Sequence, residues 1–269
     1  MGDHPLPVDE SGATLTLVAG QRMGENLLLV VSENTPHEGR IDINRALVLV
    51  DSNGTEQKRL LESVRELEFV NFLFDETVWS TFDNRWRVAP NGELYAVEQY
   101  LDYEIAVWDP KGNRKRVVSR AYDHWDRTRA QKDNMHDIFD ALLQNQLPEY
   151  TIRVSDHDPD ITGLYPRENG TLWVLSSHGT RGKPEGSLGV FDVFDSDGRF
   201  VQTLTLMGEG EPIEDGYFFL GGRLFVVTDL LEANIASRGG RVDADEEEEE
   251  EPEPIAVICY KLDVVVAGM

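Results

Sequence analysis

One turn signal occurs three times in this sequence, as Asp51-Ser-Asn-Gly54, Asp109-Pro-Lys-Gly112 and Asp195-Ser-Asp-Gly198. An Asp at the first turn position and a Gly at the fourth are typical of a hairpin turn in which the glycine takes a positive φ. Each turn follows an apolar run, and these runs are Ala46–Val50, Ile105–Trp108 and Val190–Phe194. A hairpin that recurs along a chain indicates a repeat architecture.

The turn belongs to a longer unit with a second glycine turn and four short apolar strands. In the clearest copy we expect the strands at Trp86-Arg-Val88, Leu94-Tyr-Ala-Val97, Ile105–Trp108 and Arg116-Val-Val118. Three further copies are recognisable, at residues 15–54, 161–206 and 217–260. Antiparallel units of four strands repeated in this way predict an all-β fold, a β-propeller of about four visible blades. Trp86, Trp108 and Trp173 lie on these strands and should be buried between blades.

The composition is that of one turn-rich domain. A chain of 269 residues with 40% hydrophobic residues can bury a full core, and 23 Gly and 12 Pro suit an all-β protein. We therefore expect a single propeller domain over residues 1–269. The only cysteine, Cys259, lies in an apolar strand, which predicts a buried and inert thiol.

No apolar run is long enough to cross a bilayer, so no membrane span is expected. The first residues lack the basic and apolar regions of a signal peptide. The cellular compartment stays open, and would be periplasmic or extracellular if the natural start lies upstream of Met1.

The chain is strongly acidic, with 50 Asp and Glu against 25 Lys and Arg and a net charge of −25. Nucleic acids and anionic membrane surfaces would be repelled and are not expected as partners. Part of the excess is the run Glu246–Glu251. A like-charged run between glycines and prolines predicts a disordered, solvated loop at about residues 237–254.

One segment has helical rather than strand periodicity. From Met135 to Leu143 the apolar residues recur at helical spacing, after the candidate capping residues Asp133 and Asn134 and before Pro148. We therefore predict one helix, within an insertion at about residues 124–147. Its apolar stripe is expected to pack against the propeller.

Two stretches carry a resemblance to a known family. They are Trp86–Tyr95 leading to Tyr103–Gly112, and Gly170–Val174 followed by Phe191–Phe200. In the order of these motifs, the chain resembles the bacterial six-bladed β-propeller proteins related to NHL-repeat propellers, over most of residues 27–262. The resemblance implies a propeller fold and frequent export, and it carries no catalytic signature to transfer. Four visible units indicate either a closed four-bladed ring or a six-bladed ring that has been truncated.

Blade geometry places the short glycine turns at one end of the blades and the longer connections at the other end, which we name the long-loop face. The longer connections are Ser32–Arg45, Leu61–Asn84, Ser119–Asp160, Ser176–Ser187 and Thr228–Pro254. They contain five of the six histidines: His37, His124, His136, His157 and His178. Function usually concentrates in long loops on a rigid scaffold, although loops collect polar residues in any protein.

Two groups of residues on this face resemble calcium ligands. Asp156-His-Asp-Pro-Asp160 has alternating carboxylates, but Ile161 and Arg167 stand where a calcium loop needs Gly and Glu, so a solvated turn is favoured. The second group precedes the innermost strands of successive units and comprises Asp83, Asn84, Asp160 and Asp215. These side chains would either converge on Ca²⁺ at the mouth of the central channel or merely cap strand ends.

Two functions are compatible with this sequence. The leading interpretation is a non-catalytic binding or scaffold propeller that uses its long-loop face for a protein, peptide or small ligand. The alternative is a calcium-dependent hydrolase similar to the gluconolactonase and paraoxonase propellers, with His157 or His178 as the general base. The motifs of serine hydrolases, phosphate-binding loops, dinucleotide sites and zinc proteases are absent from the sequence.

Overall fold

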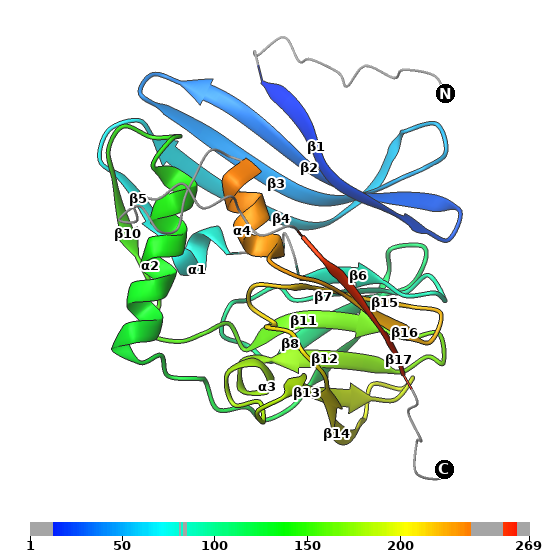
Figure 1. Cartoon of the computed structure of the whole chain (residues 1–269). Helices are drawn as coiled ribbons and strands as arrows, with labels where there is room; N and C mark the ends of the chain where they lie inside the picture. The colour runs from blue at the N-terminus through cyan, green and yellow to red at the C-terminus, as the bar shows by residue number, and fades with distance from the viewer. Residues whose placement is uncertain (1–12, 81, 83–84, 238–254, 263–269) are drawn as a thin grey trace.

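The computed structural model describes residues 13–80, 82, 85–237 and 255–262 (Figure 1). Four small antiparallel sheets are arranged as a four-bladed β-propeller, which confirms the predicted fold class. In every blade the strands follow one another in chain order, each paired with the next. The predicted acidic loop lies outside the described residues.

The blades are named here in chain order. Blade 1 consists of β1 (Thr14–Met23), β2 (Asn26–His37), β3 (Arg40–Val50) and β4 (Glu56–Glu68). Blade 2 consists of β6 (Trp86–Val88), β7 (Leu94–Ala96), β8 (Glu104–Trp108) and β9 (Arg114–Ser119). Blade 3 consists of β11 (Ile161–Pro166), β12 (Leu172–Ser176), β13 (Ser187–Phe194) and β14 (Phe200–Met207). Blade 4 has three described strands, β15 (Gly216–Leu220), β16 (Arg223–Val227) and β17 (Val257–Lys261).

The repeated turn has the predicted geometry in all three copies. Gly54, Gly112 and Gly198 have φ values of 80°, 72° and 84°. Each glycine amide donates to the carbonyl oxygen of the Asp that opens the turn. The carboxylate of that Asp then accepts two more backbone N–H groups, as Asp51 does from Asn53 and Thr55. The Asp side chain therefore fixes the turn, and the glycine supplies a conformation that other residues rarely adopt.

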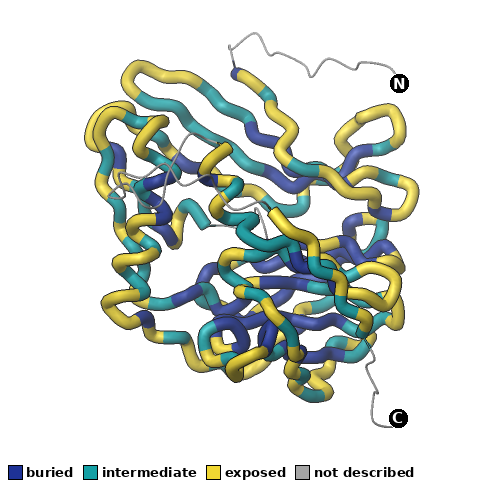
Figure 2. Tube along the Cα trace, viewed as in Figure 1, coloured by how far each residue is buried: buried dark blue, intermediate teal, exposed yellow. Residues whose placement is uncertain are grey.

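Buried apolar clusters join each blade to the next, and the dark blue segments of Figure 2 mark them. Trp86 and Trp108 lie between blades 1 and 2, and Trp173 lies between blades 3 and 4. Their exposures of 6%, 4% and 6% confirm the prediction that these side chains are buried. Among the described residues no buried apolar cluster joins blade 4 to blade 1.

The predicted helix is present as α2 (Arg129–Leu143), within the expected insertion. Its cap differs from the prediction, because Thr128 and Gln131 form a capping box and the helix begins one turn before Asp133. It ends at Leu143, before Pro148. Figure 1 shows α2 beside the propeller, next to β5 (Phe72–Asp75) and β10 (Tyr150–Arg153).

The expectation of a single helix is wrong in detail. Three shorter helices are also described, α1 (Glu76–Trp79), α3 (Ser177–Arg181) and α4 (Leu230–Ser237). Asp75 and Ser176 cap α1 and α3 through their side chains, which explains why these loop segments turn into helices. In addition, β5 and β10 pair in parallel, because the insertion brings two distant segments together. No described helix has both the length and the apolar character needed to cross a membrane.

Two further expectations are corrected. Residues 32–45 are not a long loop, because β2 and β3 continue to a tight hairpin at Gly39, where φ is 81°. His37 therefore lies on a hairpin and not in a long connection. Cys259 is exposed and not buried, because its strand β17 presents it on the face that points away from blade 3.

Candidate functional site

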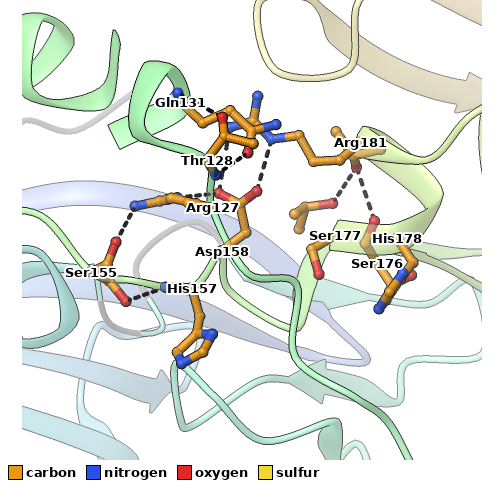
Figure 3. Close-up of polar contacts among 12 residues, drawn as sticks. Arg127, Thr128, Gln131, Ser155, His157, Asp158, Ser176, Ser177, His178 and Arg181 are labelled. Atoms are coloured by element: carbon orange, nitrogen blue, oxygen red, sulfur yellow. Dashed lines mark hydrogen bonds and ion pairs between the residues drawn. The ribbon is translucent and has the colours of Figure 1, made fainter. Parts of the chain in front are cut away.

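The candidate site lies on the long-loop face, where connections from blades 2 and 3 meet. It combines residues 120–128, which lead into α2, with residues 154–160, which lead into β11. The third segment is α3, between β12 and β13. An isolated antiparallel bridge between Asp126 and His157 pairs the first two segments. Residues far apart in the sequence are thereby held side by side (Figure 3).

Arg127 is the centre of a buried polar network. Its Nη1 and Nη2 donate to Glu76 Oε2 and Oε1 at 2.6 and 2.8 Å, and its Nε donates to Asp158 Oδ1 at 2.6 Å. The Arg127 side chain is only 1% exposed. Tyr100 donates its hydroxyl to Glu76 Oε1 at 2.7 Å, and the Ser155 amide donates to Glu76 Oε2 at 2.9 Å. Every charge in this centre is therefore paired, and this pairing offsets the desolvation penalty of burying the charges.

Asp158 extends the network to α3, as it lies between Arg127 and Arg181 in Figure 3. Arg181 Nε donates to Asp158 Oδ2 at 2.8 Å. The predicted solvated turn at residues 156–160 is thus correct for Asp156, which is exposed and pairs with Lys132. It is wrong for Asp158 and Asp160, which are 5% and 1% exposed. The two guanidinium groups at Asp158, and an imidazole at Asp160, replace the water that the prediction assumed.

Asp160 is paired with a histidine that the sequence reasoning did not select. His124 Nδ1 lies 2.8 Å from Asp160 Oδ1. The hydrogen bond to Asp160 raises the pKa of the His124 imidazole, and the nearby carboxylates of Asp102 and Asp126 act in the same direction. Burial raises the pKa of the Asp160 carboxyl, against the opposing effect of His124.

The predicted base candidate His157 lies beside this pair. Its ring centroid is 5.4 Å from that of His124, and its Nδ1 lies 2.9 Å from Asp126 Oδ1. Two imidazoles and three carboxylates are therefore gathered on one part of the long-loop face. Such a group offers several hydrogen-bond donors and acceptors to a partner.

The second base candidate, His178, stands on α3 among aromatic rings. It makes T-shaped contacts with Tyr122 and Trp125, at centroid distances of 5.2 and 5.1 Å. Its Nε2 lies 2.9 Å from the carbonyl oxygen of Asp123. The Tyr122 hydroxyl is 2.7 Å from the Ser177 hydroxyl. These contacts fix the imidazole at the rim of a pocket.

This pocket has a volume of about 460 Å³ and opens between α3 and the connection that follows β9. Its charged wall is the ion pair of Arg120 Nη1 with Asp192 Oδ1, at 2.6 Å. The Tyr103 hydroxyl also donates to Asp192, which leaves that carboxylate fully engaged. The other lining residues that matter here are Tyr122, Asp123 and His178. The pocket therefore offers rings and polar groups together.

The predicted calcium ligands are only partly described. Asp83 and Asn84 lie outside the described residues. Asp160 is bound to His124, whereas Asp215 belongs to blade 4, where its carboxylate accepts the backbone N–H groups of Glu211 and Asp229. Within the described part of the chain, no group of three or more His, Cys, Asp and Glu side chains is placed to hold a metal ion. The shared calcium site stays a prediction.

No motif in the sequence indicated the buried network. Glu76 and Arg127 are 51 residues apart, and neither stands in a recognisable motif. A weak indication existed for Arg127, which stands directly before a helix cap. If neighbouring segments bury a charged residue at such a position, it needs a partner of opposite charge. His157 and His178 were selected because they fall in long connections.

Comparisons with known proteins add little to this description. No protein-family model matches the sequence, and no curated protein sequence matches it significantly. Among solved structures it is similar to an acylaminoacyl peptidase of Pyrococcus horikoshii, with a TM-score of 0.36 and 10% identity over 80% of this chain and 28% of that one. A second neighbour, an acylaminoacyl peptidase in complex with Z-Gly-Gly-Phe-chloromethyl ketone, has a TM-score of 0.34 and the same identity and coverage. The chain thus spans 28% of these proteins, and a likeness at this level carries no argument about its activity.

Proposed function

We propose that this protein is a non-catalytic binding propeller, and that its long-loop face around α3 holds a peptide, a protein segment or a small ligand. The observation that carries the proposal is the buried network of Arg127. It joins three separate segments of the face below the exposed groups.

The network supports binding because it fixes the face before a partner arrives. Arg127 and Asp158 connect the segments at residues 120–128 and 154–160, and Asp158 with Arg181 connects them to α3. Binding to a mobile loop loses free energy when that loop is ordered, whereas a pre-organised site avoids this loss. A stable scaffold with charges buried beneath its loops is therefore suited to a recognition surface.

The exposed chemistry above the network supports the choice of ligand class. Tyr122, Trp125 and His178 provide ring surfaces, and these side chains combine apolar area with hydrogen-bonding atoms. The pocket next to them is of the size that small-molecule sites commonly have. Arg120 and Asp192 in its wall are already paired with each other, so a ligand with both apolar and hydrogen-bonding groups fits better than a highly charged one.

The test is selection of ligands from a random peptide library and, in parallel, from a panel of small metabolites. For the tightest ligand, affinity would be compared between wild type, Tyr122→Ala and a control variant on the opposite end of the blades, Asn53→Ala. We expect Tyr122→Ala to weaken binding about tenfold or more and the control to leave it unchanged. A ligand whose affinity is unchanged by Tyr122→Ala and lowered by Asn53→Ala would contradict the proposal.

The alternative is a calcium-dependent hydrolase of the lactonase or esterase type. Its support is the position of Asp160 beside His124 and His157. A carboxylate that orients an imidazole is the arrangement that a general base requires. This alternative depends on the calcium site and is tested through it below.

A further inference from the structure

The pocket between α3 and the connection after β9 carries a negative charge that its own wall does not balance. Its lining residues that are charged at neutral pH are Arg120, Asp123 and Asp192. Arg120 pairs with Oδ1 of Asp192, and the Tyr103 hydroxyl donates to Oδ2. Asp123 is exposed, and its carboxylate has no hydrogen bond or ion pair with any residue that the structure describes. The pocket therefore has an excess of one carboxylate.

The tautomer of His178, beside this carboxylate, is fixed by a backbone group. Nε2 of His178 lies 2.9 Å from the carbonyl oxygen of Asp123, and a carbonyl oxygen can only accept a hydrogen bond. Nε2 therefore carries the proton. In the neutral imidazole Nδ1 then keeps its lone pair, and within the described part of the chain no donor reaches it. His178 thus adds a hydrogen-bond acceptor next to Asp123.

The segment that carries Asp123 is held against α3 by Tyr122. The His178 amide donates to the Tyr122 hydroxyl at 3.0 Å, and this hydroxyl lies 2.7 Å from that of Ser177 (Figure 3 shows both α3 residues). Tyr122 also lines the pocket. An aromatic side chain combines a large apolar surface with a polar tip. An apolar stem can therefore pack on Tyr122 while its polar end reaches Asp123 and His178.

Together these groups offer two acceptors and an aromatic ring to one ligand. We infer that the pocket binds a cation with N–H donors on an apolar stem, the chemistry of an alkylguanidinium or alkylammonium group. The N–H groups donate to the Asp123 carboxylate and to His178 Nδ1, and a hydrogen bond between charged groups is stronger than one between neutral groups. The net charge of −25 also concentrates cations around the protein. The inference rests on the proposed binding function and narrows its ligand class.

Such a cation can be the side chain of an arginine or lysine in a peptide, or a free small molecule. The test is a nuclear magnetic resonance titration of the full chain, labelled with nitrogen-15. The peptide probe is acetyl-arginine methylamide, and the small-molecule probe is butylguanidine, which lacks the peptide groups. Tighter binding of the arginine probe would identify a peptide ligand, and equal binding a free cation. If neither probe binds at millimolar concentration, the inference is overturned.

Two analogues separate the charge from the N–H donors. Acetyl-citrulline methylamide keeps the shape and N–H groups of the arginine probe without its charge, and should bind about tenfold more weakly or worse. Acetyl-trimethyllysine methylamide keeps a charge without N–H donors, and should bind about tenfold more weakly than acetyl-lysine methylamide. Equal binding of the citrulline probe, or tighter binding of the trimethylated one, would overturn the inference.

Asp123→Asn tests the carboxylate, since it removes the charge and keeps the backbone carbonyl that holds His178. We expect the affinity for acetyl-arginine methylamide to fall about tenfold. The matched control is Asp197→Asn, which removes the same charge in the glycine turn at the opposite end of blade 3 and should change the affinity by less than about twofold. Equal losses in both variants would show that only the net charge matters, and would overturn the inference.

The imidazole supplies a separate readout. Nitrogen-15 spectra of the His178 ring should show a proton on Nε2 and none on Nδ1, and the Nδ1 resonance should move when the arginine probe binds. A proton on Nδ1 of the free neutral ring, or an unmoved resonance at saturation, would overturn the inference.

This inference can fail while the proposed function stands. A neutral or anionic ligand from the peptide and metabolite selection that loses affinity in Tyr122→Ala would confirm binding at this face and overturn the cation. If the cationic probes do not bind and the selection gives no ligand that depends on Tyr122, both are wrong.

Discussion

Arg127 and Glu76 form a bidentate ion pair whose side chains are 1% and 3% exposed. The pair connects α1 to the residue before the cap of α2. Asp158 accepts the remaining hydrogen bond of the guanidinium, from Arg127 Nε. Removing one member of a buried pair leaves the other charge without compensation, which is more costly than the pair itself is stabilising.

We therefore expect Arg127→Met to lower the free energy of unfolding by about 3–5 kcal/mol, because the Glu76 carboxylate is left buried and unpaired. Urea denaturation followed by tryptophan fluorescence would measure the loss. The matched control is Lys132→Met, which breaks the exposed pair with Asp156 and should cost less than about 1 kcal/mol. Equal losses in the two variants would show that the network does not carry this stability.

The pair of His124 and Asp160 predicts a pH dependence. The pKa of His124 is raised in the folded protein, so its contribution to stability is fully present below the pKa of an unfolded histidine. That contribution is lost as the pH rises through the raised folded-state value. Nuclear magnetic resonance titration should give a His124 pKa above that of an ordinary histidine, and Asp160→Asn should lower it.

The same pair gives a second readout. The stability difference between wild type and His124→Gln should shrink as the pH rises through the raised pKa. His136, on the exposed surface of α2, provides the control, since His136→Gln lacks this partner. A His124 pKa that does not respond to Asp160→Asn would contradict the interpretation.

Two turn glycines provide a matched pair for the cost of the positive φ. At Gly54, φ is 80° and an added Cβ meets no atom within 4 Å, so Gly54→Ala should cost about 1–2 kcal/mol of stability. At Gly198, φ is 84° and the Cβ would lie 2.7 Å from Val118 Cγ2, in the core between blades 2 and 3. Gly198→Ala should therefore cost at least about 1 kcal/mol more, measured by thermal unfolding. A similar loss at both positions would show that Val118 yields without strain.

Calcium distinguishes the two proposed functions. Asp160 is engaged by His124, so we expect millimolar calcium to change the melting temperature by less than about 1 °C, whereas a saturated site would raise it by several degrees. Calorimetric titration would check this result. A calcium-dependent rise that disappears in both Asp160→Asn and Asp215→Asn would favour the hydrolase instead.

The elements that the sequence predicted well are those fixed by local chemistry. Asp51 and Gly54 determine their turn whatever surrounds it, and the strands on either side follow from it. Trp108 and Trp173 are large enough that a strand position almost requires burial. The helix was also found, although its start was misplaced because Thr128 and Gln131 were not recognised as a capping box.

The elements that the sequence missed depend on contacts between distant residues. Asp158 was predicted to be part of a solvated turn, because no feature of the neighbouring sequence indicates that Arg127 and Arg181 are its partners. Cys259 was expected to be buried because its strand is apolar, but burial depends on whether another sheet covers that face. For the candidate site, position in a long connection identified His157 and His178, whereas the pairing of His124 with Asp160 required the fold.

The parallel pairing of β5 with β10 gives blade 2 a special place in the order of folding. The chain leaves this pair at Asp75 and returns at Tyr150, so all of blade 2 and α2 lie inside one closed loop. Other blades can add hairpin by hairpin through local contacts. Closing this loop must wait until its two ends are brought together, and this step becomes slower as the enclosed chain lengthens. We expect blade 2 to form early and the β5–β10 pair to form late. The step that locks the long-loop face would then be among the last on the folding pathway and among the first to open on unfolding.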